Sequence, residues 1–193
     1  LSASVKNNKN FSKILMENVG NLGTPSYLKK YVHTFQYNDF KSLEKLINNN
    51  KKIGVIIMEV MRNFEPKNNF LKKIRRLCSK NNIILIFDEC TSGFREVYGG
   101  LHLKYDVYPD LAMFGKSLGN GFAINAVIGK RDIMNFAKKT FISSTFWTER
   151  SGSVAGIKTL ELMQSLRSWD VISHKCRFIK QKWRTIAKKN HLK

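Results

Sequence analysis

The chain has 193 residues, of which 42% are hydrophobic and 11% aromatic. This composition is typical of one folded domain with a substantial core, and no stretch approaches the ~20 apolar residues of a membrane span, so we expect a soluble protein without a membrane partner. The net charge of +20 raises nucleic acid as a partner, but the lysines are spread along the chain among asparagines, which favours a solvated surface over a nucleic-acid site.

The three cysteines, Cys78, Cys90 and Cys176, lie far apart and have no CxxC spacing. This pattern indicates neither a disulfide framework nor a zinc site, and the four histidines have no metal-binding spacing either. We therefore expect no metal and a reducing, cytoplasmic location. The chain begins at Leu1 without a start methionine or a signal peptide, so we expect a fragment.

The first half of the chain predicts a strand, helix, strand unit after a polar, loop-like segment over residues 1–26. Asn38 or Asp39 can cap a helix whose apolar residues recur at helical spacing. The run IGVIIMEV (53–60) predicts a strand covered on both faces. A second helical stripe follows Pro66 and is formed by Phe70, Leu71, Ile74, Leu77 and Cys78. Because the run IILIFDEC (83–90) comes next, we expect two parallel neighbouring strands with a right-handed crossover.

Two acids, Asp88 and Glu89, end this second strand. In open parallel sheets ligands bind outside the carboxyl ends of the strands, so we expect both acids at the rim of the sheet and not in the core. Alternation along a strand points them in different directions, which disfavours a cooperating acid/base pair. Glu89 has two alternatives: it orients the following loop by accepting backbone hydrogen bonds, or it is solvated.

The second half predicts a loop over 91–100, a short strand DLAMF (110–114), and Lys116 at the end of that strand. A further strand is expected over 126–129, a helix over 131–139 and a hydroxyl-rich loop over 141–152. Two long helices are expected last, over 149–166 and from 169 to about 189. Their expected buried residues are Ala155, Ile157, Leu160, Leu162 and Met163 in the first, and Ile172, Phe178, Trp183 and Ile186 in the second.

An apolar strand ending in Asp-Glu and the sequence Gly115-Lys116-Ser117 together resemble parts of a nucleotide triphosphatase. A phosphate loop requires GxxxxGK[ST], however, and the position five before Gly115 is Asp110. The candidate loop also follows the acidic strand instead of preceding it. We therefore disfavour a Walker-type enzyme.

Three segments carry a more specific pattern: IFDECTSGFRE (86–96), GGLHLKYDVYPDLAMFGKSLGNGFAINAVIGKRDIM (99–134) and STFWTERSGSVAGIKTLELM (144–163). Together they resemble the class III aminotransferases, which are fold-type I enzymes that use pyridoxal 5'-phosphate, and they are closest to the glutamate-1-semialdehyde aminomutase branch. The resemblance covers nearly the whole chain. It implies an α/β domain with a mainly parallel sheet flanked by helices, in which 1–166 is part of the large cofactor-binding domain and 167–193 leads toward a missing small domain.

The resemblance also implies roles for individual residues. Asp88 matches the aspartate that pairs with the pyridine nitrogen, and Lys116 matches the lysine that forms the Schiff base with the cofactor. Thr145 matches the hydroxyl residue that contacts the cofactor phosphate of the neighbouring subunit of a homodimer, and Thr148 is an alternative beside an expected helix N-terminus. Cys90 stands where relatives place Val or Ile against the ring, with an inert core thiol as the alternative.

The implied activity is transfer of an amino group, either between two small amino and keto substrates, as in a transferase, or within one semialdehyde, as in an isomerase. The alternative is a non-catalytic homologue that keeps only the dimer surface. The resemblance also has a departure: members of the family commonly carry an Asn-Pro pair where this chain has Glu149-Arg150, which implies a divergent branch. Arg95 either serves the substrate or fixes its loop through a salt bridge, and Glu59 is a residue at the rim of the sheet whose use is left open.

Overall fold

The computed structural model describes residues 26–145 and 148–192. The loop expected over 1–26 lies outside them except at Ser26, which begins the short 3-10 helix η2 (Ser26–Lys30). Four strands are hydrogen-bonded in sequence order, and they are β1 (Val55–Glu59), β2 (Ile84–Asp88), β3 (Leu111–Phe114) and β4 (Ala126–Gly129). The chain forms two compact units: the first contains the residues up to 88 with 107–112, and the second contains 89–106 with the residues from 113 onward.

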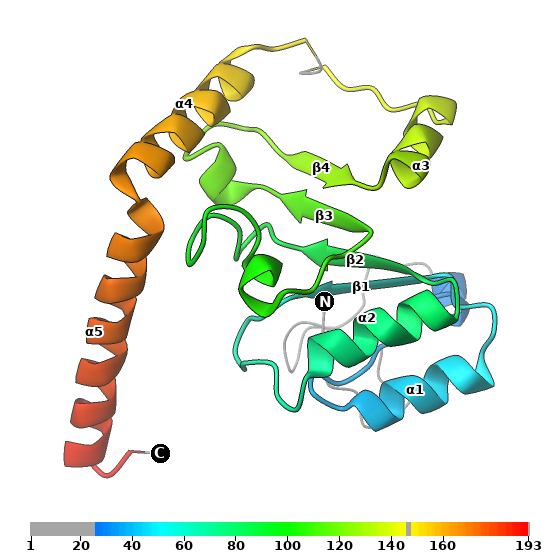
Figure 1. The fold of residues 1–193 in the computed structure, drawn as a ribbon, viewed down its shortest axis with the longest axis horizontal. Coiled ribbons are helices and arrows are strands. Elements are labelled where there is room, and N and C mark those ends of the chain that lie inside the picture. The colour runs from blue at the N-terminus through cyan, green and yellow to red at the C-terminus, as the bar shows by residue number, and fades with distance from the viewer. Residues whose placement is uncertain (1–25, 146–147, 193) are drawn as a thin grey trace. The chain divides into compact units, whose positions relative to one another are not determined.

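The first unit contains the predicted β-strand, helix, β-strand arrangement. β1 and β2 are parallel, in a register that runs from Val55 opposite Ile84 to Glu59 opposite Asp88. The helix between them, α2, spans Phe70–Lys80 (Figure 1). Its five predicted core residues are all buried, and each buried Leu, Ile or Phe contributes roughly 1.5–3 kcal/mol from its burial.

Helix α1 (Phe40–Asn49) begins where the capping residues predicted it. The Asp39 carboxylate accepts a hydrogen bond from the Ser42 amide at 3.1 Å, which satisfies one of the unpaired donors of the first turn. Leu43 and Ile47 are buried. Helices α1 and α2 contact each other and lie side by side in Figure 1.

Strand β1 differs from the prediction in the burial of its side chains. Ile56 and Met58 are buried, but Val55 is 50% and Ile57 40% exposed. β1 stands first in the strand order, and the described residues cover it on one face only. The expectation of a strand buried on both faces is therefore wrong within the described part of the chain.

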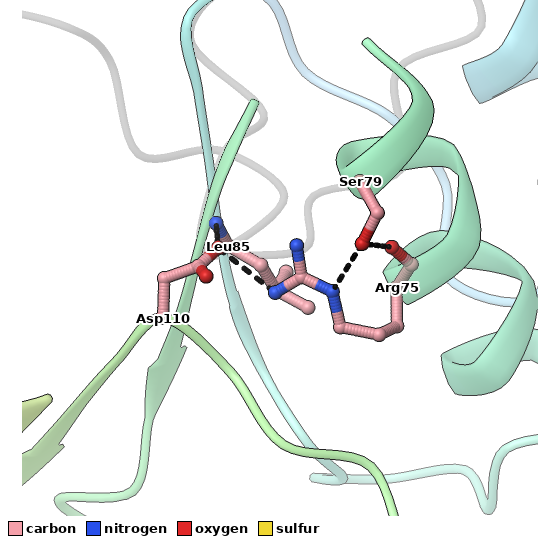
Figure 2. Close-up of polar contacts among 4 residues, drawn as sticks. All are labelled: Arg75, Ser79, Leu85 and Asp110. Carbon is pink, nitrogen blue, oxygen red and sulfur yellow. Dashed lines mark hydrogen bonds and ion pairs between the residues drawn. The ribbon is translucent and has the colours of Figure 1, made fainter. Parts of the chain in front are cut away.

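A buried carboxylate joins three segments of the first unit (Figure 2). Asp110, which precedes β3, accepts hydrogen bonds through Oδ2 from the Leu85 amide and from Nη1 of Arg75, both at 2.8 Å. The Asp110 amide in turn donates to the Leu85 carbonyl at 2.8 Å. Nε of Arg75 donates to Ser79 Oγ, which holds the guanidinium toward Asp110. One side chain thus fixes the entry of β3 against β2 and α2.

The second unit contains the remaining helices, which are η3 (Leu101–Tyr105), η4 (Lys116–Leu118), α3 (Arg131–Met134), η5 (Asn135–Lys139), α4 (Ser151–Leu166) and α5 (Ser168–Lys189). The helix predicted over 131–139 starts as α-helix and continues as 3-10 helix. The chain turns between α4 and α5 at Arg167, whose φ is 47°. No helix among the described residues is long and apolar enough to cross a membrane.

The predicted burial of α4 and α5 is largely wrong. Ile157 and Leu162 are exposed, whereas Gly152 and Gly156 are the buried positions of α4. A Cβ added at Gly152 would lie 2.9 Å from the Ala123 carbonyl oxygen, so α4 approaches its neighbour through its glycines and not through its larger apolar residues. In α5, Phe178, Trp183 and Ile186 are also exposed, and Ile172 is half-buried.

Candidate active site

Lys116 lies two residues beyond the end of β3 and begins η4. Its backbone is in the left-handed region, with φ of 47°, a conformation that costs a non-glycine residue of order 1 kcal/mol and that clusters at functional sites. The residue is exposed, and Nζ donates a hydrogen bond to Thr91 Oγ1 at 2.7 Å. The structure therefore presents a primary amine at the carboxyl end of a strand and holds it by one hydroxyl.

The backbone just before Lys116 is closely surrounded. A Cβ at Gly115 would overlap Oδ1 of Asn125 and would lie 3.5 Å from Sγ of Cys90. A side chain at this position would require Asn125 to move, and Cys90, which is half-buried, lies beside the backbone that carries the lysine. Sequence reasoning missed Thr91 and Asn125. The signal that could have identified Thr91 is its place in the loop after β2, at the same end of the sheet as Lys116.

Asp88 is the last residue of β2 and is half-buried. It belongs to the first compact unit and Lys116 to the second, so their meeting in one site stays a prediction. Glu59 pairs in register with Asp88 at the end of β1. Its carboxylate is nearly buried and lies 3.4 Å from Nε of Arg62, which indicates a structural ion pair.

Glu89 corrects the expectation of two acids at the rim, because its exposure is 0%. Its carboxylate accepts hydrogen bonds from the Ser92 hydroxyl, from the His102 amide at 2.9 Å and from His102 Nδ1 at 2.8 Å. Burial alone would raise the pKa of Glu89, but the bonds from His102, Ser92 and the Leu101 amide together lower it below its ordinary value. The solvated alternative is wrong, and the loop-orienting one is confirmed.

The two threonines expected near a phosphate are both exposed. Helix α4 begins at Ser151, later than expected, and the Glu149 carboxylate accepts from the amides of Ser151 at 2.8 Å and Gly152 at 3.2 Å. The bonds from Ser151 and Gly152 hold the pKa of Glu149 below its ordinary value. The first amides of α4 are thus occupied by the chain's own carboxylate, and the roles of Thr145 and Thr148 stay predictions. Residues 146 and 147 lie outside the described part.

Among solved structures, the fold is similar to that of acetylornithine aminotransferase from Elizabethkingia anophelis, with a TM-score of 0.72 and 26% identity over 81% of this chain and 41% of that one. It is also similar to the FumI protein of Sphingopyxis sp. MTA144, reported in its PLP internal aldimine form, with a TM-score of 0.70 and 23% identity over 74% of this chain and 36% of that one. These likenesses confirm the predicted fold class.

The sequence itself is 39% identical to 3-aminobutyryl-CoA aminotransferase of Cloacimonas acidaminovorans, over 80% of this chain and 39% of that protein. It is 36% identical to glutamate-1-semialdehyde 2,1-aminomutase of Citrifermentans bemidjiense, over 81% of this chain and 39% of that protein. The chain thus spans about two fifths of the length of these relatives. The class III aminotransferase family matches residues 2–193, and the chain belongs to that family.

Proposed function

We propose that the protein transfers amino groups with pyridoxal 5'-phosphate and that Lys116 is the residue to which the cofactor is attached. The observation that carries this proposal is the exposed Lys116 amine at the end of β3, held by Thr91 on a strained backbone, in a chain of the class III family. An accessible amine at a strand end is what covalent attachment of an aldehyde requires.

The residues around Lys116 fit the aldehyde end of such a cofactor. Cys90 offers a small, polarizable surface beside the backbone that carries Lys116, and Asn125 fills the space that a side chain at position 115 would occupy. The phosphate end has less support, because Glu149 already bonds the first amides of α4. Phosphate binding at Thr145 or Thr148 would therefore use hydroxyl groups, or would displace Glu149.

The chemistry divides between cofactor and protein. When bound, pyridoxal phosphate supplies a ring that accepts electrons from the substrate carbon. Asp88 would hold the pyridine nitrogen in its protonated form, since a carboxylate stabilises a positive charge beside it. Lys116 would first bind the aldehyde through Nζ and, once a substrate amine has replaced it, carry a proton to and from the substrate through the same atom. Thr91 orients that nitrogen.

We also propose a small amino and keto, or semialdehyde, substrate and a homodimer. The family membership supports a small-molecule amino substrate, and the two kinds of relative, an aminotransferase and an aminomutase, keep both reaction types open. We further propose a reducing, cytoplasmic location, because the three cysteines are odd in number and have no CxxC spacing.

The decisive measurement is the absorbance band that appears when pyridoxal phosphate is added to the protein at its full natural length. We expect the band in the unchanged protein and not in Lys116→Ala. Lys158→Ala is a matched control, since Lys158 is an exposed lysine of α4 whose Nζ lies 3.1 Å from a carboxylate oxygen of Glu161. An undiminished band in Lys116→Ala would refute the assignment.

Turnover separates the remaining alternatives. A strict requirement for a second keto acid would exclude the mutase, and turnover without one would exclude the simple transferase. For residues 1–193 alone we expect weak retention of the cofactor and no turnover. A full-length protein that binds pyridoxal phosphate at Lys116 and turns over no amino substrate would favour the non-catalytic homologue.

A further inference from the structure

Glu89 has no part in the chemistry proposed above, yet it is the most completely buried acid among the described residues. An ionised carboxylate is costly to bury unless donors surround it, and the two oxygens of Glu89 are surrounded. Oε2 accepts from Ser92, and Oε1 accepts from both the amide and the ring of His102. These hydrogen bonds compensate the cost of burying the carboxylate, so we infer that Glu89 has a structural role in this part of the chain.

The bonds of Glu89 connect three segments of the second unit. The Glu89 amide donates to the Met113 carbonyl in β3 at 2.8 Å, and the Glu89 carbonyl accepts from the Gly93 amide at 2.8 Å. Its carboxylate holds the first turn of η3 through His102, thirteen residues away in sequence. One residue therefore ties β3, the loop after β2 and η3 together.

Thr91 lies inside this arrangement. It is within the turn that the Glu89–Gly93 bond closes, next to Ser92, whose hydroxyl is bound to Glu89. Lys116, its partner at 2.7 Å, follows β3, to which the Glu89 amide is bonded. The Glu89 carboxylate thus bonds the turn that carries Thr91, and the Glu89 backbone amide bonds the strand that leads to Lys116.

The surroundings leave little room for the loop to rearrange. A Cβ at Gly93 would lie 2.7 Å from Cδ1 of Phe114 and 2.8 Å from the Glu89 carbonyl oxygen. A Cβ at Gly100 would overlap the His102 ring and lie 2.9 Å from Glu89 Oε1. This packing holds the backbone against Glu89, Ser92 and His102. We therefore expect a change in the hydrogen bonds among these three residues to shift Thr91 or to disturb the packing.

We propose that Glu89, with His102 and Ser92, is a positioning group that sets the Thr91 hydroxyl against the Lys116 amine. This inference rests on the proposed function for its meaning in catalysis, but the arrangement itself can be tested without cofactor. Glu89→Gln keeps the size of the side chain and removes the charge. The matched control is Glu96→Gln, since Glu96 lies in the same loop but bonds Lys104 at the surface, at 2.8 Å.

The first readout is the reactivity of the Lys116 amine toward trace acetic anhydride, measured by peptide mass spectrometry relative to Lys158. An amine released from Thr91 reacts faster, so we expect Glu89→Gln and Thr91→Val each to raise the acetylation of Lys116 relative to Lys158 about fivefold. A change of about fivefold corresponds to the loss of one hydrogen bond. Glu96→Gln should leave the ratio of Lys116 to Lys158 acetylation unchanged. The double variant Glu89→Gln/Thr91→Val should react no faster than Thr91→Val alone, because Glu89 acts through Thr91.

Equal ratios in Glu89→Gln and Glu96→Gln, or effects that multiply in the double variant, would overturn the inference. If Glu89→Gln does not fold by circular dichroism, His102→Leu and His102→Asn replace it: Leu removes the ring donor and should raise the ratio, whereas the Asn amide restores a donor and should rescue it. The second readout is pyridoxal-phosphate attachment at Lys116, trapped by borohydride. If the unchanged protein shows no attachment of pyridoxal phosphate at Lys116, while the acetylation results are as expected, the proposed function is contradicted and the positioning role is still supported.

Discussion

Two hydrogen bonds accepted by the buried Asp110 carboxylate can be separated by their contributions to stability. Oδ2 accepts from the Leu85 amide, which is fully buried, and from Arg75, whose side chain is 20% exposed (Figure 2). Asp110→Ala removes the oxygen that accepts both bonds, whereas Asp110→Asn keeps an amide oxygen that can accept from Leu85 and removes the charge that pairs with Arg75. The two variants should therefore differ in a defined direction.

The magnitude follows from the burial of each partner. A buried amide left without an acceptor costs about 1–3 kcal/mol, and the loss of the carboxylate beside Arg75 costs about 1 kcal/mol, because the guanidinium still reaches water. We expect Asp110→Ala to lower the free energy of unfolding by about 3 kcal/mol and Asp110→Asn by about 1 kcal/mol. Ser79→Ala, which removes only an exposed hydroxyl bonded to Arg75, should cost less than about 0.5 kcal/mol.

Urea unfolding followed by circular dichroism measures the three free energies, and hydrogen exchange of the Leu85 amide gives a local readout. The Leu85 amide should exchange faster in Asp110→Ala and at nearly the original rate in Asp110→Asn. If Asp110→Asn proves as costly as Asp110→Ala while Leu85 stays protected, the ion pair and not the amide bond carries the stability. A cost below about 0.5 kcal/mol for Asp110→Ala would refute the reasoning altogether.

The remaining predictions concern a buried thiol and a helix cap. Burial raises the pKa of Cys78 to about 11, with Arg75 opposing the shift, so at pH 8 iodoacetamide should modify the exposed Cys176 and spare Cys78 until the protein unfolds, as mass spectrometry would show. Modification of Cys78 as fast as Cys176 at pH 8 would contradict the expected protection of the thiol. Because the unfolded thiol ionises near pH 9, the contribution of Cys78 to the free energy of unfolding should also fall as the pH rises from about 9 to 11. Asp39→Ala should cost about 1 kcal/mol in thermal unfolding, and Asp39→Asn much less, since the amide oxygen still accepts from Ser42; equal losses would argue against a cap.

The elements of the fold could be predicted because their determinants are local. The strand over 126–129 has the predicted bounds, and α1 starts at the residue after Asp39, because caps, turns and apolar spacing act within a few residues. The burial of α4 and of β1 could not be predicted in the same way. Ile157 and Val55 have the apolar character of core residues, but whether they are covered depends on what packs there, and Gly152 shows that α4 makes its close approach elsewhere.

For the candidate site, the sequence pattern placed Lys116 correctly at the end of a strand, since the rule that parallel strands present functional groups at their carboxyl ends needs only the order of elements. The same rule failed for Glu89. Its partner His102 lies thirteen residues further on, in a short 3-10 helix that no periodicity indicated. A buried acid and an exposed one look alike in sequence when the donors that decide between them are distant.

Glu149 changes what the N-terminus of α4 can bind. In the structure the Glu149 carboxylate bonds the amides of Ser151 and Gly152 at the start of α4. A helix N-terminus that already holds a carboxylate attracts a second anion less, because its donors are taken and the two charges repel. If the proposed phosphate site lies here, its affinity would therefore come from hydroxyl groups more than from the α4 dipole, since Glu149 already occupies the first amides of the helix.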